Sequence, residues 1–148
     1  MSKPRPIPLE TVRHVRDTCL CLHAQRAARA LARRFDNAFA PFGITNGQFS
    51  LLMALNRPDS PGLGEVAQLL AMDRTTLTAA LKTLEARGLV TVALDAADRR
   101  RRRLSLTEAG HDALRRALPV WCSEHALIEA ERPGFDAAAA RAMLLQLG

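Results

Sequence analysis

Residues 71–107 decide the fold of this 148-residue chain, and they read AMDRTTLTAALKTLEARGLVTVALDAADRRRRRLSLT. The segment begins with a helix pattern whose apolar positions recur at the spacing of one buried face. These positions are Leu77, Ala80, Leu81 and Leu84. Gly88 ends the helix, and two alternating strand patterns follow at residues 89–94 and 103–106, separated by a run of arginines. The stretch therefore predicts a helix followed by a two-stranded hairpin.

A second short helix is expected just before this one, at residues 64–70. Met72 and Asp73 form the turn between the two helices, and Asp73 is well suited to cap the second helix with its carboxylate. Two short helices joined by a turn of three or four residues, with the small Ala67 where they cross, have the spacing of a helix-turn-helix. Helix-turn-helix plus hairpin is the layout of a DNA-reading helix followed by a wing.

The side of the reading helix opposite its apolar face carries basic and hydroxyl side chains and no acid until Glu85. Threonines at a helix N-terminus can bond phosphates or base edges, and arginines at a wing tip suit the negative potential of a narrow minor groove. Strand alternation turns part of the arginine run away from DNA, so Arg100 is the first candidate and Arg99 the second. The predicted DNA-contacting residues are Arg74, Thr75, Thr76, Thr78, Lys82, Arg99 and Arg100.

Composition agrees with a basic, mainly helical domain. The formal net charge is +6, the isoelectric point is near 10.5, and 48% of residues are hydrophobic with few aromatics. This balance points to an anionic partner such as nucleic acid. The arginine run also has a simpler interpretation, in which it only keeps the turn exposed to solvent. An alternative function for the same basic surface is that of a nonspecific nucleoid-associated or RNA-binding protein.

The segments that flank the predicted helix-turn-helix and hairpin are expected to position them and to contribute a subunit interface. Met1–Pro8 carries three alternating prolines and predicts an extended arm. A long helix from about Leu9 to Phe39 has two apolar stripes, of which the first suits a subunit interface. That stripe consists of Val12, Val15, Cys19 and Leu22. Thr45–Gln48 has the spacing of a capping box, and it predicts the start of the next helix.

The C-terminal third reads as two more helices. The first is capped by Thr107 and contains Pro119, which removes one backbone hydrogen bond and predicts a kink or a division. A last, alanine-rich helix over Ala137–Leu147 is too small to form its own core. We expect this helix to pack on another helix or on a second subunit.

The central stretch resembles the MarR (multiple antibiotic resistance regulator) family of bacterial transcription regulators. The shared pattern lies in the reading helix, the wing and the start of the next helix. It consists of Asp73-Arg74-Thr75-Thr76, Leu84-Glu85, Gly88-Leu89-Val90, Asp98, Arg100 and Leu106-Thr107-Glu108-Ala109-Gly110. The resemblance covers about a quarter of the chain closely, and the order of elements matches over nearly all of it.

The resemblance implies a winged helix-turn-helix homodimer on a palindromic operator, with residues 45–107 as the DNA-binding lobe of a single chain, 1–148. Residues 9–40 and 108–148 are then dimerisation helices. In the wing, Asp98 is similar to the family acid that orients an arginine, here Arg100, toward the minor groove. Where many members carry arginines in the reading helix, this chain has Ala79 and Thr83, so readout leans on Arg74, the threonines and Lys82.

A regulator of this family is released from DNA by a signal, and the sequence leaves several candidates open. Cys21 resembles the helix-one cysteine of the peroxide-sensing branch, with Cys122 as a resolving partner, but the tyrosines of that branch are absent because the chain has no Tyr. Cys19 reads more simply as a small core residue. A small apolar or aromatic acid near His23, Arg26 or Trp121 is the ligand alternative. The candidate switch residues are Cys19, Cys21, His23 and Cys122.

Several other classes find no support in the sequence. No phosphate-binding glycine loop, nucleophile elbow or paired carboxylates indicate an enzyme, and the cysteines and histidines lack zinc-site spacing. We therefore expect no cofactor and no metal. No apolar run approaches a membrane span, no signal-peptide core is present, and the three cysteines suit a reducing compartment, so a soluble cytoplasmic protein is expected.

Overall fold

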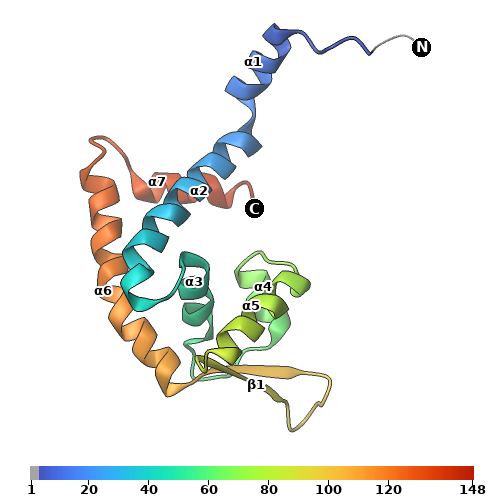
Figure 1. Cartoon of the computed structure of the whole chain (residues 1–148), viewed down its shortest axis with the longest axis vertical. Helices are drawn as coiled ribbons and strands as arrows, with labels where there is room; N and C mark the ends of the chain where they lie inside the picture. Colours follow the sequence, from blue (N-terminus) through green and yellow to red (C-terminus); the bar gives the residue numbers. More distant parts are fainter. Residues whose placement is uncertain (1–3) are drawn as a thin grey trace. The chain divides into compact units, whose positions relative to one another are not determined.

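The computed structural model describes residues 4–148, and helices dominate it (Figure 1). The predicted arm at Met1–Pro8 lies partly outside the described residues, and Pro4–Pro8 has no regular secondary structure. The chain divides into two compact units, one up to Arg34 and one from Phe35 to Gly148. The elements are α1 (Leu9–Thr18), α2 (Leu20–Phe39), the 3-10 helix η1 (Ala40–Phe42), α3 (Asn46–Leu55), α4 (Leu63–Leu69), α5 (Arg74–Ala86), β1 (Val90–Leu94), β2 (Arg102–Leu106), α6 (Glu108–Ala130) and α7 (Ala137–Leu145).

The predicted fold class is confirmed: the chain is mainly helical with one antiparallel hairpin. Strands β1 and β2 pair from Val90 opposite Leu106 to Leu94 opposite Arg102. The alternation expected for the hairpin also holds, because Val90 and Leu104 are buried while Val92 and Leu106 are half-buried against the core. One face of the hairpin therefore covers the domain, and the other is exposed to solvent.

The hydrophobic core lies entirely within the second unit. Leu77, Leu81 and Leu84 of α5 enter it as predicted, with Ala80 half-buried at its edge. The capping box at the start of α3 is also confirmed, since the Thr45 hydroxyl accepts from the Gln48 amide and Gln48 accepts in return from the Thr45 amide. On α3, Phe49, Leu52 and Leu55 are buried, whereas Met53 is 39% exposed and lines a surface cleft.

Helices α4 and α5 form the predicted helix-turn-helix beside the hairpin (Figure 1). The turn reverses the chain at Ala71, whose φ of 50° is left-handed and unusual for a residue with a β-carbon. Two hydrogen bonds hold it there, from the Ala71 amide to the Gln68 carbonyl and from the Met72 amide to the Ala67 carbonyl. This paired pattern is the Schellman motif, and it delivers the chain to the cap of α5 at Asp73.

The same motif ends α5 and joins it to the wing. Gly88 has a φ of 70°, and the Leu89 amide returns to the Leu84 carbonyl at 3.0 Å. The Leu89 carbonyl in turn accepts from the Thr107 amide at 3.1 Å, directly below the first turn of α6. A β-carbon placed on Gly110 would lie 2.2 Å from that carbonyl oxygen, so only glycine allows α6 to pass so close.

The first long helix predicted at residues 9–39 is in fact two helices. Cys19 has an extended ψ of 107° and separates α1 from α2, while the hydroxyl of Thr18 donates to the His14 carbonyl at 2.7 Å. A bond of this kind is compatible with an unbroken helix, since Thr78 and Thr83 make it within α5. The 3.6-residue periodicity continues through the break. Neither α1 nor the part of α2 up to Arg34 has a buried residue.

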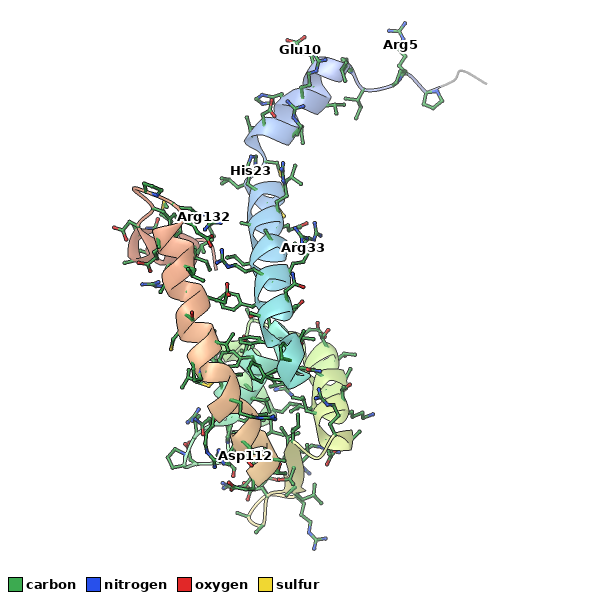
Figure 2. The ribbon with its side chains drawn as sticks, turned by 60° about the vertical axis from the view of Figure 1, so that its left-hand side comes forward. Arg5, Glu10, His23, Arg33, Asp112 and Arg132 are labelled. Atoms are coloured by element: carbon green, nitrogen blue, oxygen red, sulfur yellow. The ribbon has the colours of Figure 1, made fainter. Side chains whose placement is uncertain are left out.

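The C-terminal helices differ from each other in burial. Helix α6 runs without interruption through Pro119 and buries Ala113, Leu114, Ala117 and Ile128. Asp112 lies near the start of α6 (Figure 2). Arg115 pairs with Asp112 and with Glu108. Helix α7 buries none of its residues, and Leu145 at its end is 78% exposed. Within residues 4–148 no helix combines the length and apolarity that a bilayer crossing requires.

Candidate nucleic-acid interface

The exposed face of α5 carries the residues predicted to read DNA. Arg74, Thr75, Thr78 and Lys82 are all exposed, while the opposite face is buried. Asp73 caps the helix by accepting from the Thr76 amide at 2.8 Å and from the Thr76 hydroxyl at 2.6 Å. The N-terminal end of α5 is therefore held firmly, with its positive dipole end and its first side chains open to solvent.

Two of the predicted threonines already use their hydroxyl protons within the helix. The Thr76 hydroxyl donates to Asp73, and the Thr78 hydroxyl donates to the Arg74 carbonyl at 2.7 Å. Each oxygen can still accept a hydrogen bond, for example from an exocyclic amino group of a base, and each methyl group can contact a thymine methyl. The threonines are thus oriented as acceptors and apolar contacts.

The cap of α5 makes the stability of this lobe depend on pH. The hydrogen bonds from the Thr76 hydroxyl, and then from the Thr76 amide, hold the pKa of Asp73 below its usual value. A lowered folded-state pKa stabilises the protein above the ordinary Asp value of about 3.9, and that contribution is lost as the pH falls through the folded-state pKa.

We therefore expect the free energy of unfolding to fall less steeply with acidification, below about pH 5, in Asp73→Asn than in the wild-type chain. Asparagine keeps a cap acceptor for the Thr76 amide but does not titrate. Urea unfolding followed by circular dichroism at several pH values measures the difference. Identical pH profiles would show that the carboxylate does not contribute through its charge.

The wing is closed by an acid that sequence reasoning missed. Asp95 is buried, accepts from the Ala97 amide at 2.8 Å and pairs with the Arg103 guanidinium at 3.0 Å. The Ala97 amide, and after it Arg103, lower the pKa of Asp95 against the opposing effect of burial. Arg103 is therefore neutralised within the wing, which leaves the other arginines of the run for a partner. The signal available in the sequence was the acid directly after β1.

The predicted side-chain pair of Asp98 and Arg100 takes a different form. The Asp98 carboxylate accepts from the main-chain amide of Arg100 at 3.0 Å, and the Asp98 carbonyl accepts from the Arg101 amide at 2.8 Å. Asp98 thus shapes the turn through the backbone, because an aspartate readily bonds an amide two residues ahead. The acid that holds a guanidinium in the wing is Asp95, and its partner is Arg103.

The wing is anchored to the loop between α3 and α4. The Leu104 amide donates to the Pro61 carbonyl at 3.2 Å, and the hydroxyls of Ser60 and Ser105 lie 2.9 Å apart. Within the loop, Arg57 pairs with Asp59 at 2.6 Å, so that this acid near the basic face is neutralised by its own arginine. The loop therefore supports the hairpin without adding an unpaired negative charge at Asp59.

The α5 helix and the wing line two shared clefts, and each cleft contains two of the predicted contacts, while Thr75 and Thr76 line neither. The first cleft, of about 570 Å³, has Arg74 of α5 and Arg100 of the wing in its lining, together with Arg101, Arg102 and Arg103. The second, of about 370 Å³, has Thr78 and Lys82 of α5 opposite Arg102 of β2. Arg99 is exposed on the wing turn but lines neither cleft. The geometry can therefore present cations from two elements to one polyanion.

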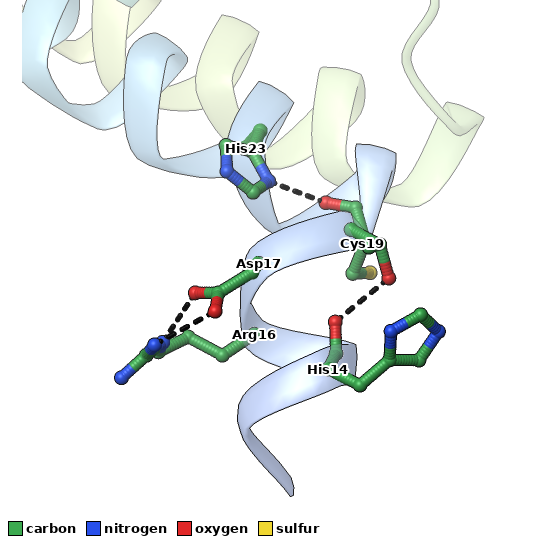
Figure 3. A network of polar contacts seen from close by, with 6 residues as sticks. His14, Arg16, Asp17, Cys19 and His23 are labelled. Carbon is green, nitrogen blue, oxygen red and sulfur yellow. Dashed lines mark hydrogen bonds and ion pairs between the residues drawn. The ribbon is translucent and has the colours of Figure 1, made fainter. Parts of the chain in front are cut away.

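The candidate switch residues fall into both units. Cys19 caps α2, with its sulfur accepting from the Leu22 amide at 3.4 Å, and its carbonyl lies 2.8 Å from a ring nitrogen of His23 (Figure 3). Cys21 accepts from the Gln25 side chain at 3.2 Å, and Cys122 is exposed on α6 in the other unit. Cys19 is half-buried in the single chain, and its burial at a subunit interface stays a prediction. Among residues 4–148, no group of three metal-ligating side chains converges.

Comparisons with known proteins agree with this geometry. A sequence model of the MarR family matches residues 42–101. The transcriptional regulator TtmR of Methylorubrum extorquens is 34% identical over 94 residues, which are 64% of this chain and 48% of TtmR. The chain spans about half the length of the curated relatives that it matches.

Solved structures match over nearly their whole length. The M. tuberculosis transcriptional regulator MosR, in complex with DNA, is 36% identical with a TM-score of 0.79, over 87% of this chain and 92% of that one. The repressor CouR of Rhodococcus jostii, bound to a 23-mer DNA duplex, is 27% identical with a TM-score of 0.71, over 97% and 96% of the two chains.

Proposed function

Because this chain belongs to the MarR family of transcriptional regulators, we propose that it is a cytoplasmic repressor that binds a palindromic operator as a homodimer. The observation that carries the proposal is that α5 and the wing line common clefts with their basic side chains. A helix and a hairpin arranged in this way suit the major groove and the adjacent minor groove of one duplex.

In this proposal the two elements have different tasks. The N-terminal end of α5 enters the major groove, where Thr75, Thr78 and Lys82 contact base edges and phosphates. Arg100 at the wing reaches the minor groove, with Arg99 beside it, because a narrow groove concentrates negative potential. Displacement of condensed counterions by these cations gives affinity that falls with salt.

The homodimer is supported by apolar side chains that this chain leaves uncovered. On α1, Val12 is 50% and Val15 is 54% exposed, and on α7 Met143 is 63% and Leu144 is 58% exposed. Large apolar surfaces of this kind usually mark a contact with another molecule. A second copy is the occupant that also supplies the second reading helix for a two-fold symmetric operator.

The signal that releases the operator is proposed to be a small, largely apolar ligand. A cleft of about 390 Å³ in the second unit, between α3, α4 and α6, is lined almost wholly by apolar side chains. Its lining residues are Phe49, Ser50, Met53, Ala54, Leu69, Leu70, Leu118 and Trp121. The volume lies within the usual range for small-molecule sites, and the fluorescence of Trp121 offers a direct measure of occupancy.

Thiol oxidation is the second candidate signal, and it is favoured by the exposure of Cys21 on α2 and of Cys122 on α6. An exposed thiol can be reached by peroxide and by a second thiol. Retention of all three titratable thiols after stoichiometric organic peroxide would exclude this route and leave the ligand route.

Selection of bound sites from a random duplex pool, with sedimentation at micromolar concentration, tests the proposed function. We expect a two-fold symmetric motif, a dimeric protein, and a preference for that motif of at least ~10³ over random DNA at physiological salt. A monomeric protein or an asymmetric motif would remove the palindromic dimer. Unenriched sequence would favour a nonspecific nucleoid-associated protein instead.

A further inference from the structure

Arg87, the residue at the C-terminal end of α5, reaches across the domain to the turn that joins α2 to α3. One terminal nitrogen donates to the Gln48 side-chain oxygen at 3.1 Å, and the other donates to the Gly43 main-chain carbonyl at 2.6 Å. These partners lie 39 and 44 residues away in sequence. Both ends of the guanidinium fork are therefore occupied by neutral oxygen atoms of a distant turn.

The turn that receives Arg87 is itself held in one conformation. Gly43 has a left-handed φ of 68°, which suits glycine best. The Asp36 carboxylate of α2 accepts from the Asn46 amide at 2.6 Å, at the start of α3. The Gln48 oxygen that binds Arg87 also accepts from the Thr45 amide at 3.1 Å, as part of the capping box. Arg87 thus binds a site that several local hydrogen bonds preorganise.

The geometry of α5 makes its C-terminal end a sensitive place to anchor. A helix of 13 residues is about 20 Å long, so a tilt of about 5° at one end moves the other end by about 1.7 Å. Hydrogen bonds to base edges tolerate only a few tenths of an ångström around their usual length. A small rotation of α5 about its Arg87 end therefore displaces Thr75 and its neighbours by more than a base-edge hydrogen bond tolerates.

We propose that Arg87 is a positioning residue for sequence-specific DNA binding, acting by fixing the direction of α5 through the Gly43–Gln48 turn. This inference rests on the proposed function, since it explains how the reading helix is aimed. Arg87 itself does not need to touch DNA for this role, because each of its terminal nitrogens already donates to a protein acceptor. Its loss should therefore affect recognition of sequence more than attraction to phosphate.

The test compares wild type, Arg87→Ala and Arg87→Lys on a selected operator and on a random-sequence duplex, each over a range of salt concentrations. We expect Arg87→Ala to bind the operator about tenfold more weakly, while random-duplex binding changes less than about twofold. The slope of log affinity against log salt should stay unchanged, whereas a lost phosphate contact lowers it by about 0.9. Arg87→Lys should also lose the preference, because one ammonium cannot reproduce a two-ended fork.

Controls separate positioning from charge and from folding. Arg116→Ala, on the exposed face of α6, removes one positive charge elsewhere and should leave the operator preference intact. Thermal unfolding of each variant sets a temperature at which all are folded. In an Arg87→Ala background, Gln48→Ala should cost little further operator affinity, because the bond from Arg87 that links Gln48 to α5 is already lost. Thermal unfolding reports the separate loss of the Gln48 bond to the Thr45 amide.

The possible outcomes distinguish failure of the Arg87 proposal from failure of the proposed function. Equal losses on operator and random duplex, a lower salt slope, full rescue by Arg87→Lys, or unchanged operator binding by Arg87→Ala would each overturn the role of Arg87 alone. If the wild-type chain shows no preference for any selected site, the proposed function itself fails, and the positioning role fails with it.

Discussion

Gly110→Ala is expected to lower the free energy of unfolding by about 3 kcal/mol, the upper range for forcing extra atoms into a packed site. The added β-carbon would lie 2.2 Å from the Leu89 carbonyl oxygen, a main-chain atom that cannot rotate away. That oxygen also accepts from the Thr107 amide, so moving it breaks the joint between the wing and α6. Chemical unfolding followed by circular dichroism measures the change.

Gly47→Ala is the matched control, because Gly47 also lies in the first turn of a helix. A β-carbon at Gly47 meets only the Thr45 hydroxyl oxygen at 3.9 Å, an ordinary contact distance. We expect this substitution to raise the free energy of unfolding by about 0.5–1 kcal/mol, the usual gain of alanine over glycine in a helix. Stabilisation by both substitutions would show that α6 does not pass as close to Leu89 as described.

Arg100→Ala is expected to weaken operator binding by about tenfold at moderate salt and to lower the magnitude of the slope of log affinity against log salt by about 0.9. Asp98 holds the main chain of Arg100, which leaves its exposed guanidinium available at the edge of the large cleft. Titration of a labelled operator at several salt concentrations measures both quantities. Arg116→Ala serves again as the control for loss of one charge.

A second substitution in the wing distinguishes a direct DNA contact by Arg100 from a purely structural role of the wing. Asp95→Asn keeps the size of the side chain but removes the negative charge that neutralises Arg103. If the wing acts through Arg100, this variant keeps the salt slope or steepens it, because a further cation becomes available. An unchanged affinity and slope in Arg100→Ala would contradict the minor-groove assignment of the wing.

The parts of the fold that were best predicted from the sequence are those determined by residues close together in the chain. The buried stripe of α5 follows from the spacing of Leu77, Leu81 and Leu84, and the α3 cap follows from Thr45 and Gln48. The hairpin follows from two alternating segments on either side of a polar turn. Each of these signals is set by residues within a few positions of one another, where periodicity and capping chemistry act directly.

The features that could not be predicted from the sequence are contacts between residues far apart in the chain and a local break in a helix. Arg87 and Gly43 meet only because α5 folds back on the α2–α3 turn. Asp95 finds Arg103 through the hairpin register, whereas the nearer Asp98 bonds the backbone. The break at Cys19 interrupts a regular apolar pattern, and periodicity does not record it because the apolar spacing continues on both sides.

Because α1 has no buried residues in a single chain, its hydrogen exchange can be used to follow dimerisation. Helix α1 has 10 residues, fewer than the roughly 12–15 that an isolated helix needs to be more than marginal in water. In a single copy we therefore expect its amides to exchange with solvent almost as fast as those of an unstructured peptide, and a protease to cleave there first. In the proposed homodimer a second copy covers its apolar face, and we expect the same segment to exchange slowly and to resist cleavage. Hydrogen exchange in the N-terminal segment would then measure the fraction of chains that are paired.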